Sequence, residues 1–394
     1  MQIQGHFKMI KFSEIASLRN EKYSPNAKES LPYIGLEHIE QQTLRLSGVG
    51  DSSAVISPKN RFYAGDILFG KLRPYFRKVY RPNFDGVCSA DIWVVNAKEG
   101  FDQAYIFYLM ASKDFINECD SGSSGTRMPR ADWKHIANTL WEVPSLEQQE
   151  LIGSYLSDLD RKIELNRKAN QTLEEIAQAI FKEWFVDFNY PGATGELVDS
   201  PLGPIPKAWE IGTLSDFGNI ICGKTPSKGN HKFFGGKIPF IKIPDMHNMV
   251  YILDTTDSLT EEGAKSQKKK NIPGGSILVS CIATIGLVSL TSQMSQTNQQ
   301  INAIIPKHSF YTYYAYHTAK NLTDRLINMG SGGSATLNIN TTSFSNVKCI
   351  LPSNTVLLKF DMMVKPLFEK ILSNQYETKM LGIIRDSLIE ELIS

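Results

Sequence analysis

The chain has 394 residues, of which 42% are hydrophobic and 21% charged, and 42 basic residues nearly balance 41 acidic ones. This length and composition predict a globular protein of two or three domains. No stretch approaches the ~18 consecutive apolar residues of a membrane span, and the N-terminus lacks the pattern of a secretory signal. The five cysteines are scattered singly. That spacing disfavours structural zinc and disulfides and favours a reducing cytoplasm.

The net charge of +1 hides an uneven distribution. Residues 1–144 carry 18 basic against 16 acidic residues, and residues 191–353 carry 14 against 10, whereas residues 145–190 carry 5 against 9. The segment from Lys59 to Arg81 holds seven basic residues and one acid. A locally basic surface is the electrostatic signature of a DNA-binding protein, so the two basic regions are candidates for contact with DNA.

The first half of the sequence recurs in the second half. Four pairs of segments match at offsets of 207 to 210 residues: Leu31–Ile34 with Ile238–Ile241, Gly65–Phe69 with Gly275–Val279, Ser121–Thr126 with Gly330–Ser334, and Pro144–Ser145 with Pro352–Ser353. Self-similarity of this kind indicates an internal duplication. The predicted boundaries are a domain at 1–144, a long helix at 145–190, a Pro/Gly-rich linker at 191–206, a second domain at 207–353 and a second long helix at 354–394.

Each copy ends in an apolar seam whose spacings of three and four residues alternate without a break. The central positions are Leu159, Ile163, Asn166, Asn170 and Leu173 in the first helix and Leu367, Ile371, Asn374, Thr378 and Leu381 in the second. This pattern predicts a coiled coil in which the helices meet each other, and the matched polar positions would fix its register. Pro366 predicts a kink or a restart of the second helix. The alternative is that each helix packs only on its own domain.

One segment partly matches a catalytic motif. Residues Gly218–Thr225 satisfy the phosphate-loop pattern GxxxxGK[ST], which would make the chain an ATP-dependent enzyme. Pro226 follows at once, however, where that motif needs the start of a helix, so we interpret the segment as a basic turn. The chain contains no Pro-Pro dipeptide, which the target-amine motif of DNA methyltransferases requires, and its histidines show no metal-binding spacing. We therefore expect no catalytic residues and no metal site.

Two segments of the first copy have the composition of a DNA-binding surface. After the apolar strand Ile67–Phe69, basic and aromatic residues alternate, and Lys71, Arg73, Tyr75, Arg77 and Lys78 are the predicted contacts. Lysine and arginine neutralise phosphates, and arginine can also bind guanine with two hydrogen bonds. The Gly/Ser-rich loop Gly122–Arg130 adds Thr126, Arg127 and Arg130. The alternatives are a charged strand edge and a plain connecting loop.

The second copy has its own candidates. A basic Gly/Pro-rich loop supplies Lys224, Thr225, Ser227, Lys228, Lys232 and Lys237, and the segment Gln296–Gln300 supplies Gln296, Asn298 and Gln299. Amide side chains can bind adenine with two hydrogen bonds, although an ordinary polar strand edge would have the same sequence. The run Lys268–Lys270 is interpreted as a solvated basic segment.

These residues resemble those of the specificity subunits of type I restriction-modification systems. The resemblance covers the whole chain. It is carried by Pro144–Phe185, above all by Leu173–Phe188 (LEEIAQAIFKEWFVDF) with the following Asn189–Gly192, and also by Gly65–Pro74 (GDILFGKLRP) and Gly223–Ser227 (GKTPS). It implies a mixed α/β fold with two target-recognition domains, each reading one half of a split DNA sequence. It also implies two long helices that pair antiparallel and act as a ruler, with pseudo-twofold symmetry. Asn166 and Asn170 would then lie opposite Asn374 and Thr378.

The same resemblance implies the partners. Two modification subunits would dock on the helices and use S-adenosylmethionine to methylate adenine N6, and two motor-nuclease subunits would use ATP and Mg²⁺ in a bacterial or archaeal cytoplasm. The chain itself would need no cofactor and have no activity. The alternatives are a standalone bipartite DNA-binding protein and an enzyme built on the phosphate-loop match.

Overall fold

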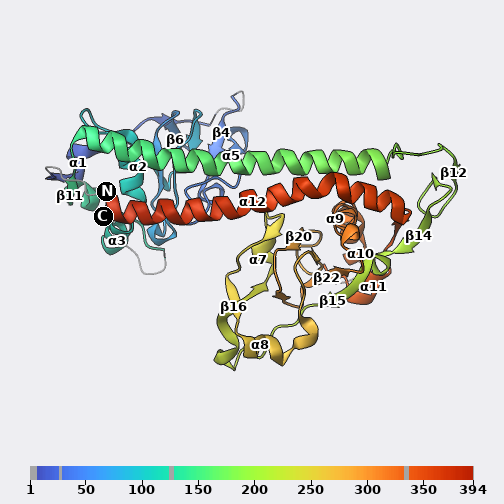
Figure 1. Cartoon of the computed structure of the whole chain (residues 1–394). Coiled ribbons are helices and arrows are strands. Elements are labelled where there is room, and N and C mark those ends of the chain that lie inside the picture. Colours follow the sequence, from blue (N-terminus) through green and yellow to red (C-terminus); the bar gives the residue numbers. More distant parts are fainter. Residues whose placement is uncertain (1–6, 26–28, 124–127, 332–336, 394) are drawn as a thin grey trace. The chain divides into compact units, whose positions relative to one another are not determined.

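The computed structural model describes residues 7–25, 29–123, 128–331 and 337–393. The chain divides into two compact units, the first formed by residues 1–164 with 379–394 and the second by residues 165–378. The two long helices are α5 (Leu146–Phe185) and α12 (Asn354–Leu392), drawn in green and red in Figure 1. Each unit therefore contains a part of both helices.

The described residues of the first unit form three small sheets and the short α-helices α1 to α4, besides the ends of the two long helices. A four-stranded sheet has the order β2-β10-β7-β8, a five-stranded sheet the order β3-β6-β9-β4-β5, and β1 pairs with β11. The elements are β1 (Lys8–Lys11), α1 (Phe12–Ile15), β2 (Ala16–Leu18), β3 (Lys22–Tyr23), β4 (Pro32–Ile34), β5 (Gly50–Asp51), β6 (Lys59–Phe62), β7 (Ile67–Gly70), β8 (Val79–Tyr80), β9 (Gly86–Cys88), β10 (Ile92–Ala97), α2 (Gln103–Ala111), α3 (Lys113–Ser121), α4 (Trp133–Asn138) and β11 (Leu140–Val143).

The second unit repeats this plan with longer strands. A five-stranded sheet has the order β15-β22-β19-β20-β17, a three-stranded sheet the order β18-β16-β21, and β14 pairs with β23. The elements are β12 (Leu197–Val198), β13 (Ile205–Pro206), β14 (Glu210–Thr213), α6 (Leu214–Phe217), β15 (Gly218–Cys222), β16 (Phe234–Ile241), α7 (Ile243–Met246), β17 (Tyr251–Ile252), β18 (Asp257–Leu259), α8 (Glu261–Ser266), β19 (Ile277–Ser280), β20 (Val288–Thr291), β21 (Gln296–Thr297), β22 (Ile301–Pro306), α9 (Thr312–Asn321), α10 (Thr323–Gly330), α11 (Thr341–Ser345) and β23 (Lys348–Leu351).

The predicted duplication is confirmed by a shared strand order in one sheet of each unit. Strands β2, β10, β7 and β8 correspond in order and direction to β15, β22, β19 and β20. A parallel pair recurs as well, because Tyr33 lies beside Val87 in the first unit and Phe240 beside Gln296 in the second. The predicted linker is not purely irregular, since β12 and β13 form an antiparallel pair within it.

Both long helices complete the core of the first unit. Ile152 and Leu156 of α5 and Ile389 of α12 are at most 3% exposed and belong to the same cluster as the apolar residues of α2 and α3. Arg385 occupies a seam position where an apolar residue is expected, yet it is only 3% exposed. Its Nη1 lies 2.6 Å from Oδ1 of Asp160 on α5, so an ion pair replaces the apolar contact.

The core of the second unit is built from aromatic side chains of the same two helices. Phe181, Trp184 and Phe185 of α5 pack with Phe360 and Phe368 of α12, and all are at most 6% exposed. The rings of Phe185 and Phe360 lie 4.9 Å apart and nearly perpendicular, an arrangement favourable for aromatic pairs. Neither helix therefore packs only on its own domain.

The predicted seam is the buried face of both helices. Ile163, Asn166, Ile371 and Asn374 are buried, and the remaining seam positions are partly buried: Leu159, Asn170, Leu173, Leu367, Thr378 and Leu381. In each unit the N-terminal part of one helix packs with the C-terminal part of the other, as expected for an antiparallel pair. The predicted restart at Pro366 is wrong, because α12 continues through this exposed residue.

The polar positions of the seam pair only in part as predicted. Asn374 Nδ2 donates to Asn170 Oδ1 at 2.8 Å, which confirms that pair. Asn166 Nδ2 instead donates to Glu377 Oε2 at 2.9 Å, and the buried hydroxyl of Thr378 has no hydrogen-bond partner among the described residues. The longer carboxylate side chain of Glu377 reaches the amide from a neighbouring position, so Thr378 is not used.

His317 is a fully buried histidine in the core of the second unit. Its Nδ1 lies 2.8 Å from Gln178 Oε1, and its Nε2 is buried without a partner among the described residues. Its ring packs among those of Phe181 and Phe368. Burial, assisted by the nearby charge of Lys320, lowers the pKa of His317 to about 3. The folded unit therefore holds this imidazole neutral.

We predict that Asn170 and Asn374 are energetically coupled. Replacing Asn374 alone by leucine should lower the free energy of unfolding by ~1–3 kcal/mol, because the partly buried amide of Asn170 loses its partner. Replacing both by leucine should recover most of that loss, since two apolar groups then face each other. Urea denaturation of the wild type, both single variants and the double variant measures the coupling. Strictly additive effects would contradict it.

We also predict that acid destabilises the second unit through His317. Because its pKa lies below the value of 6.5 expected when exposed, the unfolded state binds more protons as pH falls. Stability is full above pH 6.5 and should decline by up to ~1.4 kcal/mol per pH unit between pH 6.5 and 3. Denaturation of the wild type and His317→Gln at pH 7.5 and 4.5 checks this. The variant should lose less stability on acidification, and an equal loss would show that other groups are responsible.

Candidate nucleic-acid interface

The structure brings the two basic segments of the first copy together. After β7 the chain turns through Lys71 and Arg73 and enters the short helix η3 (Pro74–Phe76). Arg73 N donates to Pro129 O at 2.8 Å, and Ala131 N donates to Lys71 O at 2.9 Å. These bonds fix residues 71–73 beside residues 129–131, so the two segments predicted separately form one surface.

The side chains on this surface differ in their exposure and in their ion-pair partners. Lys71 and Arg73 are partly exposed, and neither has an ion-pair partner within the described ranges. Tyr75 is 43% exposed. Arg130 is exposed and lies 3.3 Å from the carboxylate of Asp91. Thr126 and Arg127, also predicted to contact DNA, lie outside the described residues.

Two residues of the predicted basic strand have a different role. Arg77 is only 8% exposed, and its Nε donates to Ala111 O at 2.6 Å while its Nη2 lies 3.1 Å from Asp386 of α12. Lys78 Nζ donates to Leu36 O, and burial lowers its pKa. The prediction that Arg77 and Lys78 face DNA is therefore wrong, because Arg77 joins the domain to α12 and the ammonium of Lys78 binds a backbone carbonyl of its own domain.

The loop after β15 in the second copy does not have the geometry of a phosphate loop. Residues Gly218–Cys222 form a strand paired with β22, and no helix follows Thr225. Lys224 N, which would face phosphate in such a loop, donates to Thr297 O at 2.9 Å. A Cβ at Gly223 would lie 2.1 Å from Asn298 O, so glycine is required there by close packing and not by a nucleotide. The phosphate-loop alternative is wrong.

This loop lies against the run Lys268–Lys270, which was expected to be merely solvated. Gln267 Nε2 donates to Lys224 O at 2.7 Å, and Lys270 Nζ donates to Cys222 O at 2.9 Å. Lys224, Lys228, Lys268 and Lys269 are exposed and have no ion-pair partner within the described ranges. We call these four residues the lysine face. The run is visible in the sequence, but only the contacts of Gln267 and Lys270 place it beside the loop.

The remaining candidates of the second copy divide into exposed and buried groups. Ser227, Lys232 and Lys237 are exposed, and Thr225 is partly exposed with its Oγ1 2.9 Å from Oε1 of the exposed Gln299. Gln296 is fully buried. Its Nε2 donates to Ala264 O at 3.0 Å and to Asn271 Oδ1 at 2.6 Å, and its Oε1 accepts from Gln267 at 2.6 Å. The prediction that Gln296 reads bases is therefore wrong.

The prediction that Asn298 reads bases is wrong for the same reason. This residue is 8% exposed, and its Nδ2 donates to Gln300 Oε1 at 2.8 Å. Since β21 is a strand that includes Gln296, the alternative of an ordinary polar strand is correct for the start of this segment. Gln299 alone of the three amides remains on the surface.

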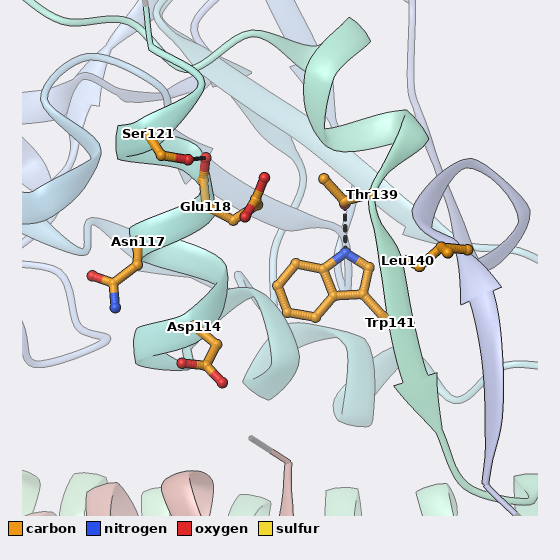
Figure 2. A pocket seen from close by; sticks show the side chains of 7 residues that line it. All are labelled: Asp114, Asn117, Glu118, Ser121, Thr139, Leu140 and Trp141. Atoms are coloured by element: carbon orange, nitrogen blue, oxygen red, sulfur yellow. Dashed lines mark hydrogen bonds between the residues drawn. The ribbon is translucent and has the colours of Figure 1, made fainter.

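A shallow pocket in the first unit lies between α3 and the β11 region (Figure 2). It is lined by Asp114, Asn117, Glu118, Ser121, Thr139, Leu140 and Trp141. The indole Nε1 of Trp141 donates to Thr139 Oγ1 at 2.7 Å. The lining carries two carboxylates and no basic side chain, so it does not suit a phosphate or a nucleotide. Among the described residues there is no cluster with metal-ligand composition and no helix that could span a membrane.

The duplicated fold agrees with the comparisons to known proteins. The family model for the type I restriction modification DNA specificity domain matches the chain twice, over residues 5–175 and 206–355. The chain belongs to this family. It is 37% identical to the type I restriction enzyme HindI specificity subunit of Haemophilus influenzae, over 85% of this chain and 87% of that protein. It is 28% identical to the MjaIX specificity subunit of Methanocaldococcus jannaschii, over 75% and 69% of the two chains.

A solved structure confirms the fold of this family member. The type I restriction-modification system S subunit from M. genitalium matches with a TM-score of 0.60 over 100% of this chain and 98% of that chain, at 14% identity. The expected mixed fold of two similar domains and long helices is thus confirmed.

We predict that Gln296 and Gln299 respond oppositely to substitution. Gln296→Ala should destabilise the second unit by ~1–3 kcal/mol, because the hydrogen bonds of the fully buried Gln296 side chain to Gln267, Asn271 and Ala264 are lost. Gln299→Ala should leave stability nearly unchanged, since the side chain is exposed. Thermal and urea denaturation of both variants checks this. Equal stability of the Gln296 variant and the wild type would contradict the buried network.

Proposed function

We propose that this chain is the DNA-recognition subunit of a type I restriction-modification complex, with each copy binding one half of a bipartite target. The observation that carries the proposal is the double match to a DNA specificity domain on a duplicated fold. Both copies place unpaired basic side chains on exposed loops, Lys71 and Arg73 in one and the lysine face in the other. Such groups supply the phosphate contacts that dominate DNA affinity.

The long helices are proposed to act as the spacer and as the docking site of modification subunits. Helix α12 exposes large apolar side chains that no neighbouring element covers: Leu358, Met362, Met363, Tyr376, Met380, Ile383 and Ile384 are 44–69% exposed. Met362, Tyr376 and Ile383 follow one another at multiples of seven residues and thus share one face of the helix. A second apolar stripe opposite the buried seam suits a protein partner.

The chain is proposed to have no catalytic activity of its own. The modification subunits would bind S-adenosylmethionine and methylate adenine N6, and the motor-nuclease subunits would use ATP and Mg²⁺ to translocate and cleave DNA. The assembled complex would then be an adenine methyltransferase and a site-specific deoxyribonuclease. Co-purification with a methyltransferase distinguishes this from a standalone DNA-binding protein, which would bind its target without one.

We predict that the two domains determine the two halves of the target independently. Replacing residues 207–353 with the matching domain of a relative should change one half of the methylated sequence, because α5 and α12 remain. Sequencing of methylated DNA from cells that express the full chimera with its modification subunit gives the result. The unaltered chain is the control. A change in both halves would show that the domains do not read separately.

A further inference from the structure

The turns after β7 and β19 have the same backbone frame. Arg73 in the first copy and Ala283 in the second have left-handed conformations, with φ of 52° and 65°. Arg73 N donates to Pro129 O at 2.8 Å, and Ala283 N donates to Leu337 O at 2.9 Å. In both copies a further bond closes the frame, from Ala131 N to Lys71 O and from Ile339 N to Cys281 O, each at 2.9 Å.

These backbone hydrogen bonds hold the turn in the same conformation in both copies, although the side chain at the turn differs. Left-handed φ is uncommon for residues other than glycine, and neither arginine nor alanine favours it. Because both copies adopt it with the same hydrogen bonds, the conformation is imposed by the paired segments. The equivalent positions 73 and 283 therefore present different side chains on one scaffold.

Arg73 differs from the other described arginines of the first unit because its guanidinium has no polar partner among the residues that the structure describes. The others are each engaged: Arg19 with Asp66, Arg45 with Glu40, Arg61 with Glu29, Arg77 with Asp386, Arg81 with Ser157, Arg130 with Asp91, Arg161 with Asp158 and Arg385 with Asp160. Within the described ranges Arg73 has neither an ion pair nor a side-chain hydrogen bond, and its Nε is buried without a partner. Its guanidinium carbon lies 5.9 Å from the ring centre of Phe76, which supports the side chain from one side.

The second copy lacks a comparable arginine. Arg325 is the one arginine between residues 207 and 353, and its Nη1 donates to Lys348 O at 2.9 Å. Several lysines of that copy have no ion-pair partner within the described ranges, among them those of the lysine face, Lys232 and Lys237. An ammonium group is a point charge that suits phosphate, whereas the planar guanidinium fork matches the two acceptors of guanine.

We propose that the two copies bind the two halves of the target by different chemistry. Arg73 makes a two-bond contact with a guanine in the half bound by the first domain. The second domain holds the DNA backbone through the lysine face and reads its bases without arginine. This inference rests on the proposed function, since it assigns residues within that DNA interface.

The decisive variant is Arg73→Lys in the full chain, assembled with its modification subunit. Lysine keeps the charge but loses the fork, so the salt dependence of binding should stay and base discrimination should fall. At one position of one half-site, preference for guanine should drop about ten- to a hundredfold in competition binding. The matched control is Arg325→Lys, which removes the single arginine of the second domain and should leave both halves of the target unchanged.

The lysine face is tested separately with Lys268→Ala combined with Lys269→Ala. The double variant should bind all sequences more weakly, and its target should stay the same. Its log–log salt slope should be lower by ~0.9 for each phosphate that the protein no longer neutralises. Thermal denaturation shows that each variant is folded. An unchanged salt slope, or a relaxed second half-site, would overturn the assignment of this face to phosphate.

The outcomes distinguish failure of this inference from failure of the proposed function. If the wild-type assembly shows no sequence-specific DNA binding, the proposed function fails. If the wild type is specific but Arg73→Lys discriminates as well as the wild type does, the proposed function stands and the inference about Arg73 is overturned. Relaxation of the target by Arg325→Lys would overturn the claim that the second domain reads without arginine.

Discussion

Neither recognition domain closes its hydrophobic core by itself. In the first unit Ile152 and Leu156 of α5 and Ile389 of α12 belong to one core cluster with residues of α2. In the second unit Phe181 of α5 and Phe360 of α12 belong to one core cluster with residues of α9. Full burial of one such side chain contributes ~1.5–3 kcal/mol, so the helical residues supply a large share of the marginal stability of a domain. The core of each domain thus depends on segments of both long helices, which lie far apart in the sequence.

Because the long helices pack into both domain cores, few residue types are suitable at their buried positions. The seam must serve the other helix and a domain at once, which explains why it departs from a regular apolar pattern at Asn170, Asn374 and Arg385. These three departures are each matched by a partner, since the two asparagines bond to each other and Arg385 binds Asp160, whereas the seam residue Thr378 has no hydrogen-bond partner among the described residues. A buried pair of this kind adds little net stability, but removing one member leaves the other unsatisfied. Such pairs favour one alignment of the helices over others, because a shifted register would break them.

The sequence predicted the elements that repeat over many residues and missed contacts made by single side chains. The duplication and the helical seam each extend over many residues, so neither prediction depends on the interpretation of a single residue. Both were confirmed. Composition could not separate Gln296 from Gln299, since both lie in the same polar segment, yet one is fully buried and the other exposed. It could not separate Arg73 from Arg77 either. What decides their roles is the carboxylate of Asp386, more than 300 residues away in the sequence.

The left-handed turn at Arg73 and Ala283 has the same backbone in both copies but presents different side chains at the surface. Positions 73 and 283 share φ, hydrogen bonds and neighbours in the sheet, so the backbone energy of the turn does not depend on a favourable contact of the side chain. At a position whose side chain makes no contact that the fold needs, one copy can have arginine and the other alanine while the core stays the same. Arg77, four residues further on, has no such freedom, because Asp386 and Ala111 hold its guanidinium inside the unit. The residues free to differ between the copies without a change of fold are therefore those whose charged groups the fold leaves unbound.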